Sequence, residues 1–80
     1  MHYVYVLRDK SNKKLYIGYS SDIEQRLKRH QLTNKDIELI YYEAYQLEEI
    51  ARDRERRLKM YGSSWRALKQ RLKLPPNKTA

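Results

Sequence analysis

The length of the chain limits its fold more than any other feature of the sequence. Eighty residues are enough for one small domain and too few for two, since domains start at roughly 50 residues. A chain of this size buries only about 60–65% of the surface that it exposes when unfolded, so its hydrophobic core is small. The sequence has no cysteine, which excludes disulfides, thiol catalysis and zinc–thiolate sites. We expect a single domain over residues 1–74 and a short flexible tail over residues 75–80.

The positive charge of the chain is concentrated in its last third. The sequence contains 18 basic and 10 acidic side chains, which give a formal net charge of +8. Residues 1–53 contain nine of each kind, whereas residues 54–80 contain nine basic residues and one acidic residue, Glu55. This surplus favours a polyanionic partner, nucleic acid first and an anionic membrane surface second. From composition alone, the alternative is that the positive charge only keeps the protein soluble and has no binding partner.

The sequence also bears on the compartment of the protein. No apolar run approaches the roughly 20 residues of a membrane span. The N-terminus lacks the pattern of a signal peptide. We therefore expect a cytoplasmic protein.

Three runs of β-branched and aromatic residues predict three strands. They are residues 2–7 (HYVYVL), 15–19 (LYIGY) and 37–45 (IELIYYEAY). A short polar connector separates the first two runs, which most simply pair as an antiparallel hairpin. Gly18 lies inside the second run, where a glycine often marks a close approach of another group to the backbone.

Helical patterns follow the second and third strands. Asp22 with Gln25 is a variant of the capping box, so we expect a helix from Asp22 to about Gln31. A longer helix starts at Leu47 and ends at Gly62, a typical C-cap residue. Its inward stripe is predicted from the 3.6-residue period and consists of Leu47, Ile50, Ala51, Arg54, Leu58 and Tyr61.

A last helix completes the predicted domain. Ser63 or Ser64 caps its start, and its inward residues are Trp65, Leu68 and Leu72. The element order is therefore β-β-α-β-α-α. This order predicts an α+β domain in which helices flank a small three-stranded antiparallel sheet.

Tyrosine replaces phenylalanine throughout the sequence, which has eight tyrosines and no phenylalanine. A phenol hydroxyl seeks a hydrogen-bond partner when it is buried. We interpret four of the tyrosines as ordinary amphipathic residues of the third strand and the long helix: Tyr41, Tyr42, Tyr45 and Tyr61.

The first two strands and the first helix bring polar side chains together. Tyr16 and Gly18 share a face of the second strand, because alternate strand residues point to the same side. Pairing with the first strand would place them near Tyr5. Arg26 and His30 follow one turn apart on the first helix. This arrangement puts phenols, a guanidinium and an imidazole in one neighbourhood.

These residues resemble the motifs of the GIY-YIG nuclease superfamily, in particular its short stand-alone bacterial members. The resembling segments occur in the same order as in the superfamily: Tyr3-Val4-Tyr5, Tyr16-Ile17-Gly18, residues 26–30 (RLKRH), and Ala51 followed by Glu55. The resemblance covers about residues 3–73. It implies a metal-dependent phosphodiesterase that acts on DNA.

The resemblance also implies roles for individual residues. Glu55 matches the glutamate that holds one divalent cation, and a lone carboxylate suits Mg²⁺, with Mn²⁺ able to substitute, because Mg²⁺ keeps much of its water shell. Tyr5 matches the tyrosine proposed as general base or water positioner. Tyr16 matches the tyrosine that helps to orient the nucleophile. Arg26 matches the arginine that contacts the scissile phosphate, and His30 matches a position that assists proton transfer.

Further basic residues are candidates for DNA binding. Lys28 and Arg29 lie beside the predicted site on the first helix. The other candidates lie on the last helix: Arg66, Lys69, Arg71 and Lys73. Contacts from these side chains to phosphates would give salt-sensitive binding that tolerates many sequences.

Three functions are compatible with these features. The first is a Mg²⁺-dependent DNA endonuclease of low intrinsic sequence specificity, in DNA repair or recombination, without a small-molecule cofactor and with a partner protein as a possible source of specificity. The second is a non-catalytic nucleic-acid-binding module that retains the nuclease fold. The third is a basic adaptor for an acidic protein, in which Tyr5, Arg26 and Glu55 would have no role. In both alternatives Glu55 need only be the i,i+4 partner of Lys59.

Overall fold

The computed structural model of the protein describes residues 1–74, so the predicted tail lies outside the described residues. The elements follow the predicted order β-β-α-β-α-α: β1 (His2–Asp9), β2 (Leu15–Ser20), α1 (Ile23–Thr33), β3 (Ile37–Tyr45), α2 (Glu48–Met60) and α3 (Gly62–Arg71). The α+β fold predicted from the sequence is confirmed. None of the helices described has the length and apolar character needed to cross a membrane.

β1 is the central strand of an antiparallel sheet with the order β2-β1-β3. β2 and β3 are therefore both edge strands, and each leaves one row of backbone groups unpaired in the sheet. Tyr5 of β1 pairs with Gly18 of β2 on one side and with Tyr42 of β3 on the other. The register of β1 with β3 shifts between Val6 and Leu7, where the pairing is irregular.

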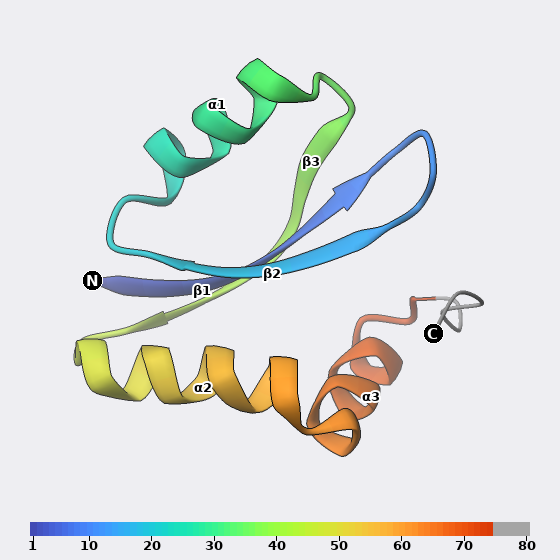
Figure 1. Ribbon diagram of the computed structural model, residues 1–80. Helices are drawn as coiled ribbons and strands as arrows, with labels where there is room; N and C mark the ends of the chain where they lie inside the picture. The colour runs from blue at the N-terminus through green and yellow to red at the C-terminus, as the bar shows by residue number, and fades with distance from the viewer. Residues whose placement is uncertain (75–80) are drawn as a thin grey trace.

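Helices cover both faces of the sheet (Figure 1), with α1 over one face and α2 and α3 over the other. On the α1 side, Ile23 and Leu27 pack against a buried cluster of Tyr5, Leu7 and Ile37. On the opposite side, α2 and α3 contribute to a second cluster of Val4, Val6, Ala51, Leu58 and Leu68. Because β1 alternates its side chains between the two faces, it supplies both clusters.

The ends of α1 are fixed by local hydrogen bonds. The Asp22 side chain accepts a hydrogen bond from the backbone N–H of Gln25 at 3.1 Å, as the capping pattern predicts. After the helix, Asn34 donates from its side chain to the buried carboxylate of Asp9 at 2.7 Å. Hydrogen bonds from Ser11 and Asn34 lower the pKa of Asp9 to about 2. Asp9 thereby ties the end of α1 to the β1–β2 turn.

The junction between α2 and α3 differs from the prediction. Tyr61 ends α2 and also precedes α3, with an extended backbone at φ −110° and ψ 108°. Its carbonyl oxygen already accepts the N–H groups of Ser64 and Trp65, so α3 begins without a side-chain cap. Gly62 is the first residue of α3 and has no positive φ, so the prediction that it is the C-cap of α2 was wrong, as was the prediction of a serine cap.

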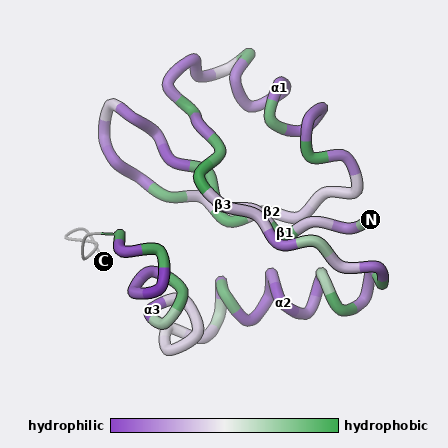
Figure 2. Tube along the Cα trace, turned by 180° about the vertical axis from the view of Figure 1, so that it is seen from behind, coloured by the Kyte–Doolittle hydropathy of each residue, from purple (hydrophilic) through white to green (hydrophobic). Residues whose placement is uncertain are grey.

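The inward stripe of α2 is narrower than predicted. Ala51 and Leu58 are buried, but three other members of the predicted stripe are exposed: Leu47, Ile50 and Tyr61. Leu47 and Tyr61 flank the helix rather than lying within it, and Ile50 projects about 100° away from Ala51. In the hydropathy view (Figure 2), hydrophobic and hydrophilic segments alternate along α2, as expected for a helix with a single apolar face.

Candidate active site at the edge strand β2

Tyr5 and His30 meet above the middle of β2. Tyr5 is only 3% exposed, and its hydroxyl lies 3.4 Å from Nε2 of His30. The two rings are arranged edge to face, with centroids 6.2 Å apart. A Cβ atom added to Gly18 would overlap Cζ and the hydroxyl oxygen of Tyr5. The phenol therefore extends across Gly18, toward the free edge of the sheet.

The close approach of Tyr5 to Gly18 leads to a prediction. Gly18→Ala should displace the Tyr5 ring and separate it from His30, because the new methyl group needs the space that the phenol fills. We expect a loss of about 1–3 kcal/mol in the free energy of unfolding, which is typical of an overpacked site. Urea denaturation would measure the loss. An unchanged midpoint would contradict the close packing of these two residues.

Arg26 lies next to the Tyr5–His30 pair. One of its terminal nitrogens, Nη1, is 3.4 Å from the carbonyl oxygen of Tyr19, the residue after Gly18 in β2. No ion pair within residues 1–74 involves Arg26. A planar guanidinium without a carboxylate partner beside the site is suited to bind a phosphate through two parallel hydrogen bonds.

Glu55 approaches β2 from the opposite face of the sheet. One turn before it on α2, the Arg52 guanidinium lies over the Tyr19 ring, 4.5 Å from the centroid. One turn after it, Lys59 lines a groove together with Tyr16. Residues three or four apart share a side of a helix, so Glu55 faces the segment of β2 between Tyr16 and Tyr19. Its side chain is 21% exposed.

The predicted catalytic residues are thus brought to one strand, but not all into mutual contact. Tyr5, Arg26 and His30 reach β2 from the α1 side, and Glu55 reaches it from the α2 side. Tyr16 is an exposed residue of β2 itself. Among the hydrogen bonds and ion pairs of residues 1–74, none joins Glu55 to the three residues on the α1 side. The free edge of β2 is therefore the place where a substrate could touch both groups.

Glu55 is paired with a cation in the structure. Its Oε2 atom lies 3.2 Å from Nζ of Lys59, which is the i,i+4 pairing weighed from the sequence. The Lys59 side chain is more than half exposed, and such a pair contributes about 0.3–0.5 kcal/mol. A divalent cation could therefore replace the ammonium at small cost.

The donor set around Glu55 fits one kind of metal. Within residues 1–74, no three His, Cys, Asp or Glu side chains gather into a group that could hold an ion. Mg²⁺ commonly binds through one or two carboxylates together with several waters and substrate phosphates. A single partly exposed carboxylate is compatible with this Mg²⁺ coordination. It would not form the closed four-ligand shell of a structural zinc site.

The basic residues of the last third differ in their pairing. Four of them are ion-paired on α2, with Glu43, Asp53 or Glu55: Arg54, Arg56, Arg57 and Lys59. The predicted DNA-binding residues of α1, of α3 and of the turn after α3 form no ion pair within residues 1–74: Lys28, Arg29, Arg66, Lys69, Arg71 and Lys73. The uncompensated charge of the described last third is therefore on α3 and the turn that follows it.

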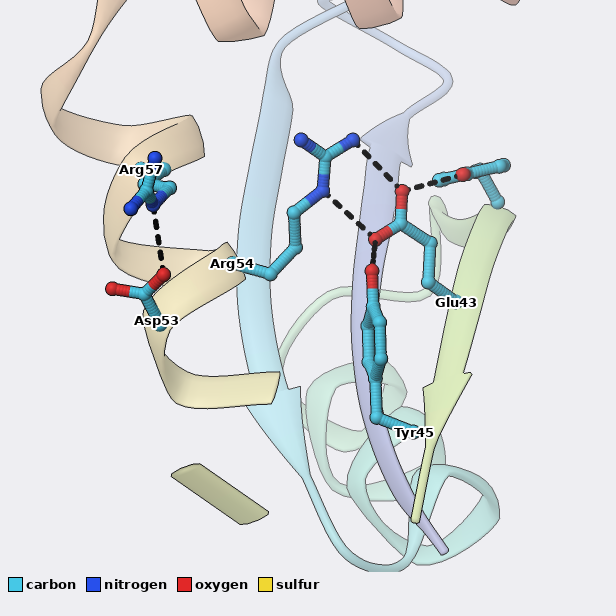
Figure 3. A network of polar contacts seen from close by, with 6 residues as sticks. Glu43, Tyr45, Asp53, Arg54 and Arg57 are labelled. Atoms are coloured by element: carbon cyan, nitrogen blue, oxygen red, sulfur yellow. Dashed lines mark hydrogen bonds and ion pairs between the residues drawn. The ribbon is translucent and has the colours of Figure 1, made fainter. Parts of the chain in front are cut away.

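A largely buried carboxylate on β3, the edge strand on the other side of β1 from β2, was missed by the sequence reasoning. Glu43 of β3 accepts hydrogen bonds at 2.6 Å from the hydroxyls of both Tyr41 and Tyr45. It also accepts two hydrogen bonds from the Arg54 guanidinium of α2, at 2.9 and 3.0 Å (Figure 3). Burial alone would raise the pKa of Glu43, but the hydrogen bonds from Arg54 and the two tyrosines lower it to about 2.

The pKa values of the two phenols in this network are raised, whereas that of Glu43 is lowered. Burial and the hydrogen bond to Glu43 raise the pKa of Tyr41 to about 12 and raise that of Tyr45 above its usual value. Tyr41 and Tyr45 are therefore partners of a buried charge, and their interpretation as ordinary strand residues was wrong. The alternation of residues 41, 43 and 45 on one strand face is the signal that could have indicated the network.

Comparison with known proteins bears on the family of the chain. The family model of the GIY-YIG catalytic domain matches residues 1–69. The chain belongs to the GIY-YIG family. It is similar to the UPF0213 protein of Haloquadratum walsbyi (strain DSM 16790 / HBSQ001), with 30% identity over 68 residues, and the match covers 75% of each chain. No solved structure matches it significantly.

The GIY-YIG match covers the whole of the candidate site. It includes every predicted catalytic residue, from Tyr5 in β1 to Glu55 in α2. Arg66 and Lys69 also lie within it, whereas Arg71 and Lys73 lie beyond its end. Membership of the GIY-YIG family supports a nuclease-type function with DNA as the substrate.

Proposed function

We propose that this protein is a Mg²⁺-dependent DNA endonuclease of low intrinsic sequence specificity. The observation that carries the proposal is the approach of two groups to the edge of β2 from opposite faces of the sheet. The Tyr5 phenol crosses Gly18 on one face, and Glu55 faces the same strand from α2 on the other. A phosphodiester lying along this edge would have both within reach.

Residues on the α1 side bind the phosphate and move the proton. Arg26 binds the scissile phosphate with its unpaired guanidinium. A neutral phenol is a poor base, so Tyr5 needs a neighbour that takes the phenol proton before its oxygen can accept one from water. His30 is that neighbour, because its Nε2 atom lies within 3.4 Å of the hydroxyl. Tyr5 and His30 thus act as one proton-transfer pair that orients the attacking water.

Glu55 would hold the Mg²⁺ ion on the α2 side. The bound ion would polarise the phosphate and stabilise negative charge on the leaving oxygen. Lys59 is the residue that the ion has to replace at the carboxylate. Mn²⁺ would substitute, because it also accepts carboxylate and water ligands.

The unpaired cations of α3 would hold the rest of the DNA. Such contacts position the backbone and carry little sequence information, so a partner protein would be needed for site specificity. DNA repair and recombination are processes in which a nuclease of this kind can act.

Charge removal on α3 tests this DNA contact. Changing Arg66, Lys69, Arg71 and Lys73 together to Gln should reduce the slope of log K against log salt by up to about 3–4, at roughly 0.9 per phosphate contact. Fluorescence anisotropy of a labelled duplex between 50 and 200 mM salt would measure the slope.

A matched control removes the same charge elsewhere. Four exposed lysines of the β1–β2 turn and the α1–β3 connection serve for this variant: Lys10, Lys13, Lys14 and Lys35. The control should change the slope by less than about 1, since it removes few phosphate contacts. Equal slopes for the two variants would mean that α3 is not the contact surface.

Cleavage of plasmid DNA by the unmodified protein tests the proposed function directly. Supercoiled plasmid should be nicked when Mg²⁺ or Mn²⁺ is present and should stay intact in EDTA. Single-stranded, duplex and branched DNA should be included, because membership of the family does not determine which DNA structure the protein cleaves best. DNA binding without cleavage of any of these forms, with either metal, would favour the non-catalytic module.

A further inference from the structure

One row of paired residues crosses the whole sheet on the side that α2 covers. Val4 of the central strand pairs with Glu43 of β3 on one side and with Tyr19 of β2 on the other. Directly paired residues point to the same face of a sheet, and Val4 belongs to the cluster that α2 helps to form. Glu43 and Tyr19 therefore both lie on the α2 face, one on each edge strand.

Two arginines of α2 reach the two ends of this row. The Arg54 guanidinium points from α2 toward β3 and donates two hydrogen bonds to the Glu43 carboxylate, at 2.9 and 3.0 Å (Figure 3). The Arg52 guanidinium lies over the Tyr19 ring, 4.5 Å from its centroid. Because residues two apart on a helix project about 200° from each other, the two arginines leave α2 on opposite sides. They hold the helix at both edges of the sheet.

The apolar contact of α2 with the sheet defines its rotation about the helix axis only weakly. α2 buries two side chains, those of Ala51 and Leu58, and burial of apolar surface is non-directional. Two parallel hydrogen bonds between a guanidinium and a carboxylate, in contrast, fix a geometry. The Glu43 and Arg54 side chains are 12% and 27% exposed, against 60% for Arg52. The Glu43–Arg54 pair is therefore the stronger of the two restraints on the rotation of α2.

The rotation of α2 decides where Glu55 points. Glu55 projects about 100° from Arg54 and lies three residues after Arg52, so it shares the β2 side of the helix with Arg52. We propose that Glu43 is a positioning residue of the active site, because through Arg54 it sets the rotation that directs Glu55 at β2. The proposal rests on the proposed function only for the role of Glu55 as the metal ligand. Glu43 lies on the opposite edge of the sheet from β2 and acts through α2 alone.

The alternative is that the Glu43–Arg54 pair only stabilises the fold. A variant without the pair would then have a lower Tm, but Glu55 would still point at β2 in the molecules that remain folded. The two roles therefore differ in the position of Glu55 in the folded protein.

Paramagnetic Mn²⁺ reports this position without DNA and without cleavage. A bound Mn²⁺ ion broadens the backbone amide NMR signals of nearby residues, and the broadening falls off steeply with distance. Mn²⁺ below one equivalent is added to isotope-labelled protein, at a temperature at which circular dichroism shows each variant to be folded. In the wild type, it should broaden the signals of α2 around Glu55 and those of Gly18 and Tyr19 in β2.

Glu43→Gln should keep the broadening in α2 and lose it at Gly18 and Tyr19. The glutamine amide keeps one acceptor oxygen, so it cannot accept both hydrogen bonds of the Arg54 fork in the same geometry. Nicking at saturating Mg²⁺ should fall about 10–100-fold, because misplacing a positioned group by about 1 Å can cost about 10²-fold in rate.

Two controls separate positioning from loss of charge and from loss of stability. Glu38→Gln removes the same charge from the same strand, where Glu38 pairs with Arg8 and not with α2. Asp9→Asn should lower the Tm at the far end of α1, where Asp9 accepts a hydrogen bond from Asn34. Both controls should keep the wild-type broadening in β2. Its loss in either control would overturn the proposal.

Arg54→Lys is a second variant, which keeps a positive charge beside Glu43 but not the two parallel hydrogen bonds. It should recover part of the Tm that Glu43→Gln loses and should still lose the broadening at Gly18 and Tyr19. Wild-type broadening in folded Arg54→Lys would show that the two hydrogen bonds do not set the rotation of α2.

The two proposals fail in different ways. Identical broadening in the wild type and in folded Glu43→Gln would overturn the positioning role and leave the nuclease function standing. Absence of broadening around Glu55 in the wild type would overturn both the metal ligand and the positioning role.

Discussion

Glu55→Gln is expected to abolish Mg²⁺-dependent nicking of plasmid DNA and to leave the fold intact. The substitution removes the charged oxygen that would hold the ion. Loss of an outer-shell partner of a metal ligand already costs 10–100-fold, so loss of the carboxylate itself should reduce the rate by more than about 100-fold. The fold should persist because the Lys59 pair that is also lost is worth only about 0.3–0.5 kcal/mol.

The matched control for this variant is Glu48→Gln on the same helix. Glu48 forms an i,i+4 pair with Arg52 at 2.7 Å, as Glu55 does with Lys59. The control therefore removes the same kind of charge and the same kind of ion pair. It should change the nicking rate by no more than about threefold, since an exposed pair contributes little. Nicking by Glu55→Gln at the wild-type rate would contradict the assignment of Glu55 as the metal ligand.

Binding of Mn²⁺ separates the metal site from catalysis. Electron paramagnetic resonance of free Mn²⁺ gives the bound fraction without any DNA. Glu55→Gln should bind Mn²⁺ more weakly than both the wild type and Glu48→Gln. Circular dichroism of all three proteins checks that the helices are retained.

The elements of this fold were predictable because their signals are local. The run at residues 37–45 is bounded by polar residues and matches β3 residue for residue. Asp22 and Gln25 lie three residues apart, and the cap that they predict is present. The Gly62 prediction failed because the extended backbone of Tyr61 ends one helix and starts the next, which no residue type near it indicates.

The candidate site was predictable only in part. The pairing of Tyr5 with Gly18 follows from strand alternation across a hairpin. The approach of Glu55 from the opposite face depends on which side of the sheet α2 packs, and nothing in the spacing of its motif determines that. The Glu43–Arg54 pair joins residues of different elements, so the sequence alone presents Glu43 as one more polar residue of an edge strand.

Glu43→Ala is expected to destabilise the protein more than any other single change to a charged residue of the described chain. The Glu43 side chain is 12% exposed and Arg54 is 27% exposed. Removing the carboxylate leaves a half-buried guanidinium and two phenol hydroxyls without their partner. Breaking such a pair costs about 3 kcal/mol, the lower end of the range for buried pairs, because Arg54 keeps some contact with water.

Urea denaturation gives this loss directly, and Glu38→Ala is the control. Glu38 is also a glutamate of β3 paired with an arginine, Arg8, but both side chains are about a third exposed. Its loss should cost at most about 1 kcal/mol. A domain of this size loses roughly 4–8 °C in Tm per kcal/mol, so Glu43→Ala should unfold at least about 12 °C below the wild type. Equal losses for the two variants would show that Glu43 is not part of a buried network.

The same carboxylate makes stability depend on pH in a known direction. Its pKa falls from 4.5 to about 2 on folding, so its contribution is complete above pH 4.5 and is lost as the pH falls through 2. The Tm difference between the wild type and Glu43→Gln should therefore be constant from pH 7 to about 5 and should shrink toward pH 2.

Asp9 has a similarly low pKa, but it is present in both proteins and cancels in the difference. A Tm difference that stays the same at pH 2 would mean that the Glu43 carboxylate is not held ionised by Arg54 and the two tyrosines. Because Arg54 immediately precedes Glu55, the same pH range would also loosen the segment of α2 that presents the proposed metal ligand.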